Sequence, residues 1–417
     1  MKITQKIIPI IALLAISACS PKEEHTVHIW QSGVCTICGL ECEHDYSNGN
    51  GKCSICNMSC KHLKSHSTDN ICDECGLYSY HNFHDGECTL CHQETNLENS
   101  VPEEFKSSVT NKGQVVDFTY HTKNYTYCAA YGTDLVDVTK KAAIYLPHDY
   151  SEDKKYNVIY LLPGQLESYD YWFRDQSVYT TNVFDHLLEA NMAEDFIAVS
   201  YNFHTMIEDY DDPSKVDAEK VKFEADADMR FVTTEGGVNE IKDYEGVCDR
   251  EIKDLIKQVE TNYSTYLEND DSDANLTATR AHRAMGGFSV GSHVSWQSGF
   301  CKSYSYIGNF VCMEGSNLTY LPYIEKAIEL QTEENLQVHF IFQQSSEKSD
   351  AEATQREFFQ EIVENNNYFE YGKNCLRLEV KGGNHWYQSY MDGLFNAMCF
   401  IFSDNPETVN VPQMLKK

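Results

Sequence analysis

The chain has 417 residues and a formal net charge of -31, from 33 Lys and Arg against 64 Asp and Glu. This excess of acid excludes nucleic acid as a partner, because phosphate neutralisation needs clustered Lys and Arg. A hydrophobic content of 41% supports a buried core and excludes wholesale disorder. The 17 cysteines are spread unevenly, with one at position 19, ten from Cys35 to Cys91 and six beyond. Their distribution indicates that two chemistries share one chain.

The first twenty residues have the pattern of an export signal. Lys2 and Lys6 precede an apolar run over 7–18, which is shorter than the ~20 residues of a membrane-spanning helix. Small residues then precede Cys19, and this end of the run resembles the lipobox of bacterial lipoproteins. We expect 1–19 to be a lipoprotein signal peptide, lipidation at Cys19, and an exported, membrane-anchored chain on the periplasmic face or cell surface. The alternative is a plain secretory signal with an incidental Cys.

A Cys and His repeat occupies residues 20–92. Four C-x-x-C pairs begin 18, 19 and 16 residues apart, and a His precedes each pair. In the two middle units a Cys stands two positions before that His, so the unit reads C-x-H and then C-x-x-C. The candidate metal ligands of the four units, in chain order, are His28, Cys35 and Cys38; Cys42, His44, Cys53 and Cys56; Cys60, His62, Cys72 and Cys75; and His81, Cys88 and Cys91.

Soft ligands in this spacing suit tetrahedral zinc, and two of the four sites are fully specified. Thr26 and Ser79 stand in the outer units where the additional Cys would fall. The alternative is a disulfide framework, which is common in exported chains. Such a framework gives no reason for His to recur in phase with Cys, so we expect structural zinc. The segment resembles zinc-ribbon-like repeats in ligand spacing, and we expect it to be a spacer or an arm for a protein partner.

The segment 93–114 is polar and aperiodic, which predicts a linker. Short apolar runs then alternate with amphipathic stretches over 115–405, ahead of a tail at 406–417. The predicted strands are 142–146, 158–162, 196–200, 284–288, 338–342 and 376–380, and the predicted helices are 183–189, 252–263, 351–363 and 390–400. This alternation predicts one α/β domain with a mostly parallel sheet covered on both faces.

The sequence Gly-Phe-Ser-Val-Gly at 287–291 lies between an apolar run and a stretch that can continue as a helix over 292–300. A strand, a sharp turn and a helix in that order form the context of a nucleophile elbow. Both glycines suit a turn that holds the serine in a strained conformation and leaves no room for side chains around it. Ser289 is therefore the candidate nucleophile.

The partners of this serine should follow it in the order acid, then histidine. His385 lies between the last predicted strand and the last predicted helix and is the candidate base, with an ordinary surface histidine as the alternative. The acid is expected after the strand at 338–342. Glu347 is the preferred candidate and Asp350 the second, although either could be an ordinary solvated carboxylate.

Residues 141–402 resemble the esterase D-like members of the family-one carbohydrate esterases, which include feruloyl and acetylxylan esterases. The resemblance lies in five segments in the expected order, 143–150, 156–164 ahead of Trp172, 251–263, 283–289 and 383–385. It implies an α/β-hydrolase fold with Ser289 as nucleophile and His385 as general base and then acid. It also implies that a carboxylate near Glu347 orients the imidazole.

The oxyanion of such an enzyme needs two backbone N–H donors, which we expect from Val290 and Gln165. Pro163 stands where the family commonly has a His, and Gln344 and Glu347 stand where it usually has a Gly and an Asp. None of these departures removes a reacting group. They favour an active enzyme over a degenerate binder.

Aromatic residues are abundant in the predicted loops. Trp172, Trp386 and Tyr387 are the candidate substrate-binding residues, and the last two neighbour His385. The alternative for each is ordinary packing.

We therefore expect a serine esterase that acts on an acylated carbohydrate or a similar small ester, without a catalytic cofactor. Two alternatives remain open. One is an acyltransferase that uses the same triad. The other is a surface lipoprotein that binds metal and ligand without catalysis.

Overall fold

The computed structural model describes residues 30–31, 34–37, 40–45, 53–56, 83–84, 87–88 and 100–402, the last range with gaps at 132, 166, 176, 217–247, 347, 350–351, 365–366, 370–373 and 381. The chain divides into two compact units. The small unit comprises Met1–His62 with Asp73–Leu77, and the large unit comprises Leu63–Cys72 with Tyr78–Lys417. The expected signal peptide with Cys19, and the expected tail, lie outside the described residues.

The small unit contains a short antiparallel ribbon. Strand β1 (Trp30–Gln31) pairs with β2 (Val34–Cys35), and Val34 also forms a bridge to Glu41. The Cys35 N–H donates to the Leu40 carbonyl at 2.8 Å, which closes a turn over the first C-x-x-C pair. Within the large unit, β3 (Phe83–His84) and β4 (Glu87–Cys88) form a second antiparallel ribbon.

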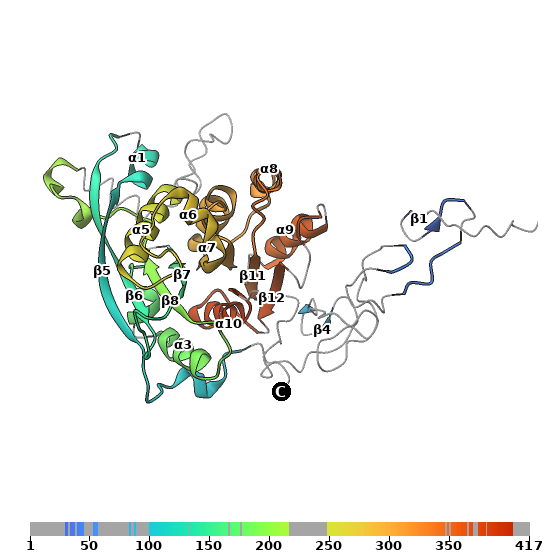
Figure 1. Cartoon of the computed structure of the whole chain (residues 1–417), viewed down its shortest axis with the longest axis horizontal. Helices are drawn as coiled ribbons and strands as arrows, with labels where there is room; N and C mark the ends of the chain where they lie inside the picture. Colours follow the sequence, from blue (N-terminus) through green and yellow to red (C-terminus); the bar gives the residue numbers. More distant parts are fainter. Residues whose placement is uncertain are drawn as a thin grey trace, which may run out of the picture. The chain divides into compact units, whose positions relative to one another are not determined.

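An eight-stranded sheet is the centre of the large unit (Figure 1). Its strands are β5 (Gln114–Lys123), β6 (Asp137–Leu146), β7 (Asn157–Leu162), β8 (Phe196–Tyr201), β9 (Arg283–Phe288), β10 (Asn309–Met313), β11 (Phe340–Ser346) and β12 (Cys375–Val380). Their order across the sheet is β12-β11-β10-β9-β7-β8-β6-β5. The neighbours from β8 to β12 are all parallel, and β6 runs antiparallel to both β8 and β5.

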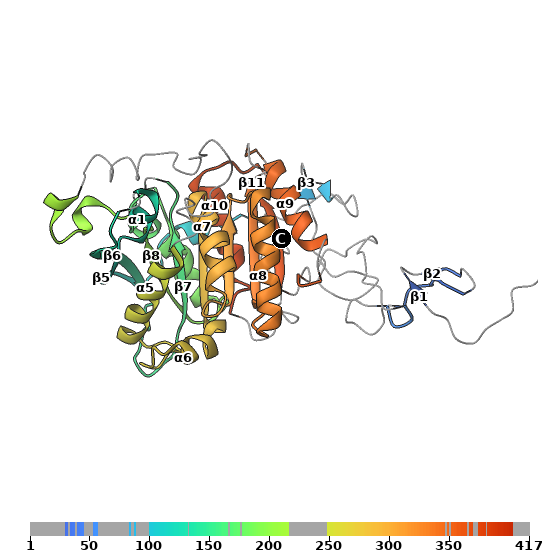
Figure 2. The ribbon, with the colours of Figure 1, turned by 90° about the horizontal axis from the view of Figure 1, so that it is seen from above.

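Helices cover both faces of this sheet (Figures 1 and 2). One core contains side chains of α2 (Tyr171–Arg174), α3 (Thr180–Glu189) and α10 (Tyr387–Met398). The other contains side chains of α5 (Cys248–Asn262), α7 (Val290–Val294), the π-helix η7 (Ser295–Ser303), α8 (Leu321–Glu333) and α9 (Glu352–Glu364). Strands buried on both faces read as near-continuous apolar runs, and β7, β9, β10 and β12 are buried along their whole length. The predicted mostly parallel α/β architecture is confirmed.

Smaller elements complete the large unit. They are η1 (Glu103–Lys106), α1 (Tyr125–Tyr131), η2 (Ile207–Asp209), η3 (Pro213–Lys215), α6 (Asp273–Ala278), η6 (Arg280–His282) and η8 (Leu318–Tyr320). The part of the chain that the structure describes contains no helix long and apolar enough to cross a membrane.

Part of the segment expected to be a linker packs into the core of the large unit. Val101 is 3% exposed, and its N–H donates to a carboxylate oxygen of Asp392 on α10 at 2.7 Å. Phe105 in η1 stacks on His186 at 4.4 Å and meets Phe395 edge-on. The large unit therefore includes residues well before 115, because two apolar side chains anchor them between α3 and α10.

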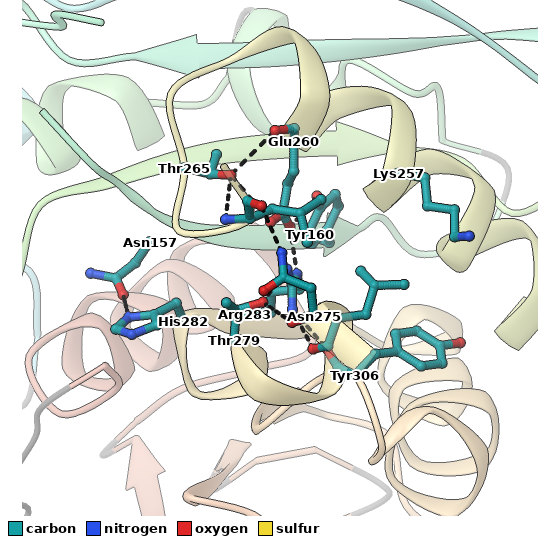
Figure 3. A network of polar contacts seen from close by, with 12 residues as sticks. Asn157, Tyr160, Lys257, Glu260, Thr265, Asn275, Thr279, His282, Arg283 and Tyr306 are labelled. Atoms are coloured by element: carbon teal, nitrogen blue, oxygen red, sulfur yellow. Dashed lines mark hydrogen bonds and ion pairs between the residues drawn. The ribbon is translucent and has the colours of Figure 1, made fainter. Parts of the chain in front are cut away.

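A buried polar network holds the amino end of β9, the strand that leads to the candidate nucleophile (Figure 3). Arg283 donates from Nε to Glu260 of α5 at 2.7 Å, and both side chains are at most 2% exposed. Its remaining nitrogens donate to the Leu276 and Tyr306 carbonyls and to the Thr279 hydroxyl. Every charge in this pair therefore has hydrogen-bond partners, as a buried ion pair requires.

Candidate active site

The candidate nucleophile lies on a strained turn between β9 and α7. Ser289 has φ 54° and ψ -119°, outside the regions that L-residues normally populate. A Cβ at Gly287 would lie 2.7 Å from the Leu162 carbonyl oxygen, and one at Gly291 would lie 2.5 Å from the Pro163 oxygen. The backbones of β7 and the elbow approach too closely for any other residue at these two positions. The glycines thus allow the turn, and the turn leaves Ser289 half-buried at the carboxyl end of the sheet.

The candidate base contacts a buried carboxylate. His385 Nδ1 lies 3.4 Å from Glu314 Oε2, and the Glu314 side chain is completely buried while that of His385 is 45% exposed. The other carboxylate oxygen, Oε1, accepts from Gln344 Nε2 at 3.3 Å. One oxygen of Glu314 therefore faces the imidazole while the other is held by the neighbouring strand.

Glu314 is positioned by the backbone of three adjacent strands. It directly follows β10, has φ 55°, and its N–H donates to the Gln344 carbonyl on β11 at 3.1 Å. One residue earlier, the Met313 carbonyl accepts from the Ser289 N–H at 2.9 Å. Ser289 and Glu314 thus stand at the carboxyl ends of neighbouring parallel strands, where α/β sheets place their functional groups.

The loop that carries His385 is tied at both sides. The Asn384 carbonyl accepts from the Ser346 hydroxyl at 2.9 Å, and the Asn384 N–H donates to the Ser389 hydroxyl at 3.0 Å. The imidazole meets the ring of Tyr390 edge-on at 5.3 Å, and Tyr390 stacks on Phe288 at 4.1 Å. This aromatic column joins the base to the residue that precedes Ser289.

The carboxylate that contacts His385 follows β10, whereas the sequence pattern favoured an acid after the next strand, β11. Glu347 and Asp350 both lie outside the described residues, so their roles stay predictions. Glu314 was missed because β10 was not among the predicted strands. The signal that could have found it is the apolar run over 310–313 followed directly by a carboxylate.

The loop expected to supply an oxyanion donor passes beside the elbow. The Gly164 N–H donates to Glu167 Oε2 at 2.7 Å, and Gln165 is the next residue along the loop. Burial raises the pKa of Glu167 to about 7, while the Gly164 N–H and the nearby imidazole of His385 act in the opposite direction. Val290, which follows the nucleophile, begins α7 and is fully buried. Both expected donors therefore lie on the segments that flank Ser289.

The three expected substrate-binding aromatics differ in their surroundings. Trp172 is fully buried, its indole N–H donates to the Leu162 carbonyl at 3.1 Å, and it packs edge-on against Phe288. It therefore supports the elbow from inside the core and does not face a substrate, contrary to expectation. Burial of a large amphipathic ring with its N–H satisfied is ordinary core packing.

Tyr387 and Trp386 flank the base in different ways. The Tyr387 hydroxyl accepts from the Tyr179 N–H at 2.8 Å and lies 2.9 Å from the Thr180 hydroxyl, so it caps the start of α3. The Tyr387 hydroxyl is therefore used in hydrogen bonds within the protein. Trp386 is 71% exposed and directly follows His385 in the chain. Of the three, Trp386 is the residue that can contact a bound molecule.

A cavity of about 410 Å³ opens next to the oxyanion loop. Glu167, Ser168 and Tyr169 line it, together with residues of β6 and of the segment after β8 that includes His204 and Met206. Its volume lies within the ~300–1,000 Å³ range typical of small-molecule sites. Glu167 borders both this cavity and the Gly164 backbone, whereas Ser289 and His385 are not among the residues that line it.

Three thiols and one imidazole of the second repeat come together in the small unit. Their ligand atoms lie within 4.8 Å of one another, and the residues are Cys42, His44, Cys53 and Cys56. Cys35 of the first repeat is described and buried, and Cys88 of the fourth lies in β4. The remaining candidate ligands lie outside the described residues; they are His28, Cys38, Cys60, His62, Cys72, Cys75, His81 and Cys91.

The sheet order, the antiparallel β6, the elbow after β9 and the histidine after β12 define an α/β-hydrolase fold. Comparison with known proteins agrees. Residues 136–296, from β6 through the elbow, match the family model described as "Putative esterase". The predicted resemblance to esterases of this fold is thereby confirmed.

Among characterised sequences, the chain is similar to endo-1,4-beta-xylanase Y of Acetivibrio thermocellus, with 26% identity over 180 residues. Those residues make up 43% of this chain and 13% of that enzyme. The chain thus spans a small part of that relative.

Two solved structures share the fold. One, described as FAE, has 21% identity and a TM-score of 0.56, with 75% of this chain and 96% of that chain covered. The other is a serine-to-alanine mutant of the feruloyl esterase module from Clostridium thermocellum complexed with sinapinate. It has 20% identity and a TM-score of 0.55, with the same two coverages.

Proposed function

We propose that the large unit is a serine esterase that cleaves feruloyl, acetyl or similar small esters of carbohydrates. The observation that carries the proposal is the strained Ser289 elbow beside the His385 and Glu314 pair. The esterase family match over 136–296 and the likeness to a feruloyl esterase module support the ester chemistry and the substrate class. The cavity beside Glu167 supports a small bound group.

The reaction begins with proton transfer from the serine. His385 holds Nδ1 toward Glu314, so Nε2 is the nitrogen that takes the proton from the Ser289 hydroxyl as its oxygen attacks the ester carbonyl. Glu314 accepts the hydrogen bond from Nδ1, which fixes the tautomer and stabilises the imidazolium. The N–H groups of Val290 and Gln165 bind the oxygen on which negative charge develops.

The tetrahedral intermediate then collapses. The ester C–O bond breaks, His385 gives its proton to the leaving alcohol oxygen, and the acyl group stays on Ser289. A water molecule then hydrolyses the acyl-enzyme. His385 takes a proton from the water, and the water oxygen attacks the acyl carbon. The bond to Ser289 breaks, His385 returns the proton to the Ser289 oxygen, and the free acid leaves. Trp386, exposed beside the base, stacks on the acyl or sugar group.

The experiment compares turnover of methyl ferulate and of an aryl acetate by the wild-type chain, Ser289→Ala and Ser177→Ala. Ser177 is an exposed serine whose hydroxyl donates to Asp175, so its removal controls for the loss of a hydroxyl. We expect Ser289→Ala to abolish turnover and Ser177→Ala to retain it. Equal turnover by all three proteins would refute the proposal.

A further inference from the structure

A second chemical centre, remote in sequence from the hydrolase motifs, occurs at the second Cys and His repeat. We call the set formed by Cys42, His44, Cys53 and Cys56 the thiol–imidazole cluster. The first two come from a C-x-H turn and the last two from a C-x-x-C turn, with a stretch of chain between them. The esterase proposal uses none of these residues.

The distances within the cluster match the edges of a coordination tetrahedron. Zinc bonds of ~2.3 Å to sulfur and ~2.0–2.1 Å to nitrogen imply ligand separations of roughly 3.8 Å between two sulfurs and roughly 3.6 Å between sulfur and nitrogen. Cys42 Sγ lies 3.7 Å from Cys53 Sγ, and Cys56 Sγ lies 3.3 Å from His44 Nδ1. Both pairs are therefore spaced to share one ion.

The distance between Cys42 and Cys53 excludes a disulfide between these two residues, and Cys56 is also a free thiol. A sulfur–sulfur bond is ~2.05 Å long, far shorter than the 3.7 Å between Cys42 and Cys53. These sulfurs approach one another without bonding, as thiolates around a cation do.

The backbone prepares Cys53 to carry negative charge. Its Sγ accepts from the N–H groups of Asp45 and Ile55 at 3.4 Å and of Cys56 at 3.5 Å. Three donors converge on one sulfur that is 2% exposed. Such donors stabilise a metal-bound thiolate and orient it, as outer-shell partners do in metal sites.

A further contact locks the two turns together. Asp45 directly follows the C-x-H turn, and its carbonyl accepts from the Ser54 N–H at 2.8 Å while its carboxylate accepts from the Ser54 hydroxyl at 2.7 Å. The turns are thus joined both by these bonds and by the converging ligands. His44 is exposed whereas Cys42 is 9% exposed, so the site lies at a surface that an ion can reach.

We propose that the thiol–imidazole cluster binds one zinc ion in a structural site of the small unit. Three thiolates and one imidazole are the soft set that zinc takes in tetrahedral sites closed by four protein ligands. With four protein ligands the ion keeps no open position, so its role is to hold the two turns together. In so short a segment, metal binding also supplies folding free energy.

The test counts zinc ions per chain by native mass spectrometry of the full-length protein. Because other repeats can also bind metal, the informative quantity is the difference between variants. We expect Cys53→Ser to hold one zinc fewer than wild type, and His44→Cys, which keeps four ligands, to hold the wild-type number. Cys128→Ser is the matched control, since that thiol belongs to the large unit and donates to the Thr133 carbonyl.

A second measurement needs no variant and so is independent of whether Cys53→Ser folds. Cys42, Cys53 and Cys56 should resist alkylation in wild-type protein and react after a chelator removes the metal. Wild type without zinc, an unchanged zinc count in Cys53→Ser, or a Cys42–Cys53 disulfide in peptide maps would each overturn the proposal. Esterase turnover plays no part in either readout, so the zinc and esterase proposals fail independently.

Discussion

Glu314 is the residue whose position most constrains the chemistry of the site. Its carboxylate lies at the end of β10, one strand nearer to the elbow than the strand end that the sequence pattern favoured. The turn that carries it also passes directly under Ser289, because a Cβ at Gly315 would collide with the Ser289 carbonyl oxygen. Glu314, the proposed acid, and Ser289, the proposed nucleophile, therefore lie on two closely packed turns.

Replacing Glu314 by Gln should lower kcat/KM for methyl ferulate by about 10²–10⁴-fold, because the amide no longer stabilises the imidazolium or fixes its tautomer. Steady-state kinetics of the purified variant, with circular dichroism as a check on folding, measure this effect. Glu347→Gln and Asp350→Asn serve as matched neutral substitutions and should stay near wild type. Loss of activity in Asp350→Asn or Glu347→Gln with full activity in Glu314→Gln would assign the acid to the end of β11 instead.

Asp392 is expected to make the stability of the large unit depend on pH. Burial raises the pKa of this carboxyl to about 7, while the Val101 N–H and the charge of Lys106 act in the opposite direction. The folded state therefore holds a proton that the unfolded state releases near pH 4. Stability from this group is full below that pH and is lost as pH rises through about 7.

Replacing Asp392 by Asn should remove the decrease of stability with rising pH, while the Asn side chain still provides an acceptor for the Val101 N–H. At about 1.4 kcal/mol per pKa unit, the wild type should lose up to about 4 kcal/mol relative to Asp392→Asn between pH 4 and 8. Urea unfolding at several pH values measures the difference. Asp153→Asn, an exposed carboxylate, is the control. Parallel pH profiles for wild type and Asp392→Asn would contradict the assignment.

At the scale of the elements, α5 and β9 depend on the pair formed by Glu260 and Arg283 (Figure 3). Glu260 also accepts from the Tyr160 hydroxyl on β7 at 3.0 Å, so one carboxylate joins a helix to two strands. Below the elbow, this arrangement holds the strand from which Ser289 emerges. The strain of the elbow persists because the strand beneath it is anchored.

Truncating Glu260 to Ala should destabilise the large unit by about 3–5 kcal/mol, because Arg283 would be left as an uncompensated buried charge. The matched control lies on the same helix: Lys257 pairs with Asp271 and Asp273 only at 3.9 and 3.8 Å near the surface. Lys257→Ala should cost less than about 1 kcal/mol. Urea unfolding midpoints of the two variants measure this difference in stability. Equal midpoints would show that the buried pair contributes no more to the free energy of unfolding than the surface pair.

The elements also show which features the sequence could predict. Long apolar runs and the local glycine pattern made six strands, four helices and the Ser289 elbow predictable, since these signals are contained in a short window. Strand β10 is only five residues long, and without it neither the sheet order nor Glu314 could be derived. The full burial of Trp172 and the anchoring of Phe105 depend on tertiary contacts that leave no periodic signal in the sequence.

The whole molecule divides into two compact units, and the uneven cysteine distribution predicts a metal-binding chemistry beside that of the esterase. The second repeat brings its four expected ligands together, whereas most ligands of the other repeats lie outside the described residues. The lipid anchor at Cys19 stays a prediction. An esterase tethered by lipid, with zinc-stabilised repeats between anchor and enzyme, would act on esters close to a membrane surface.

Covalent labelling tests directly whether Ser289 is an activated nucleophile. A fluorophosphonate probe should add one mass increment to the wild-type chain, peptide mapping should locate it on Ser289, and Ser289→Ala should take up none. An unlabelled wild-type chain, or a label carried by Ser289→Ala to the same extent, would show that Ser289 is not the nucleophile.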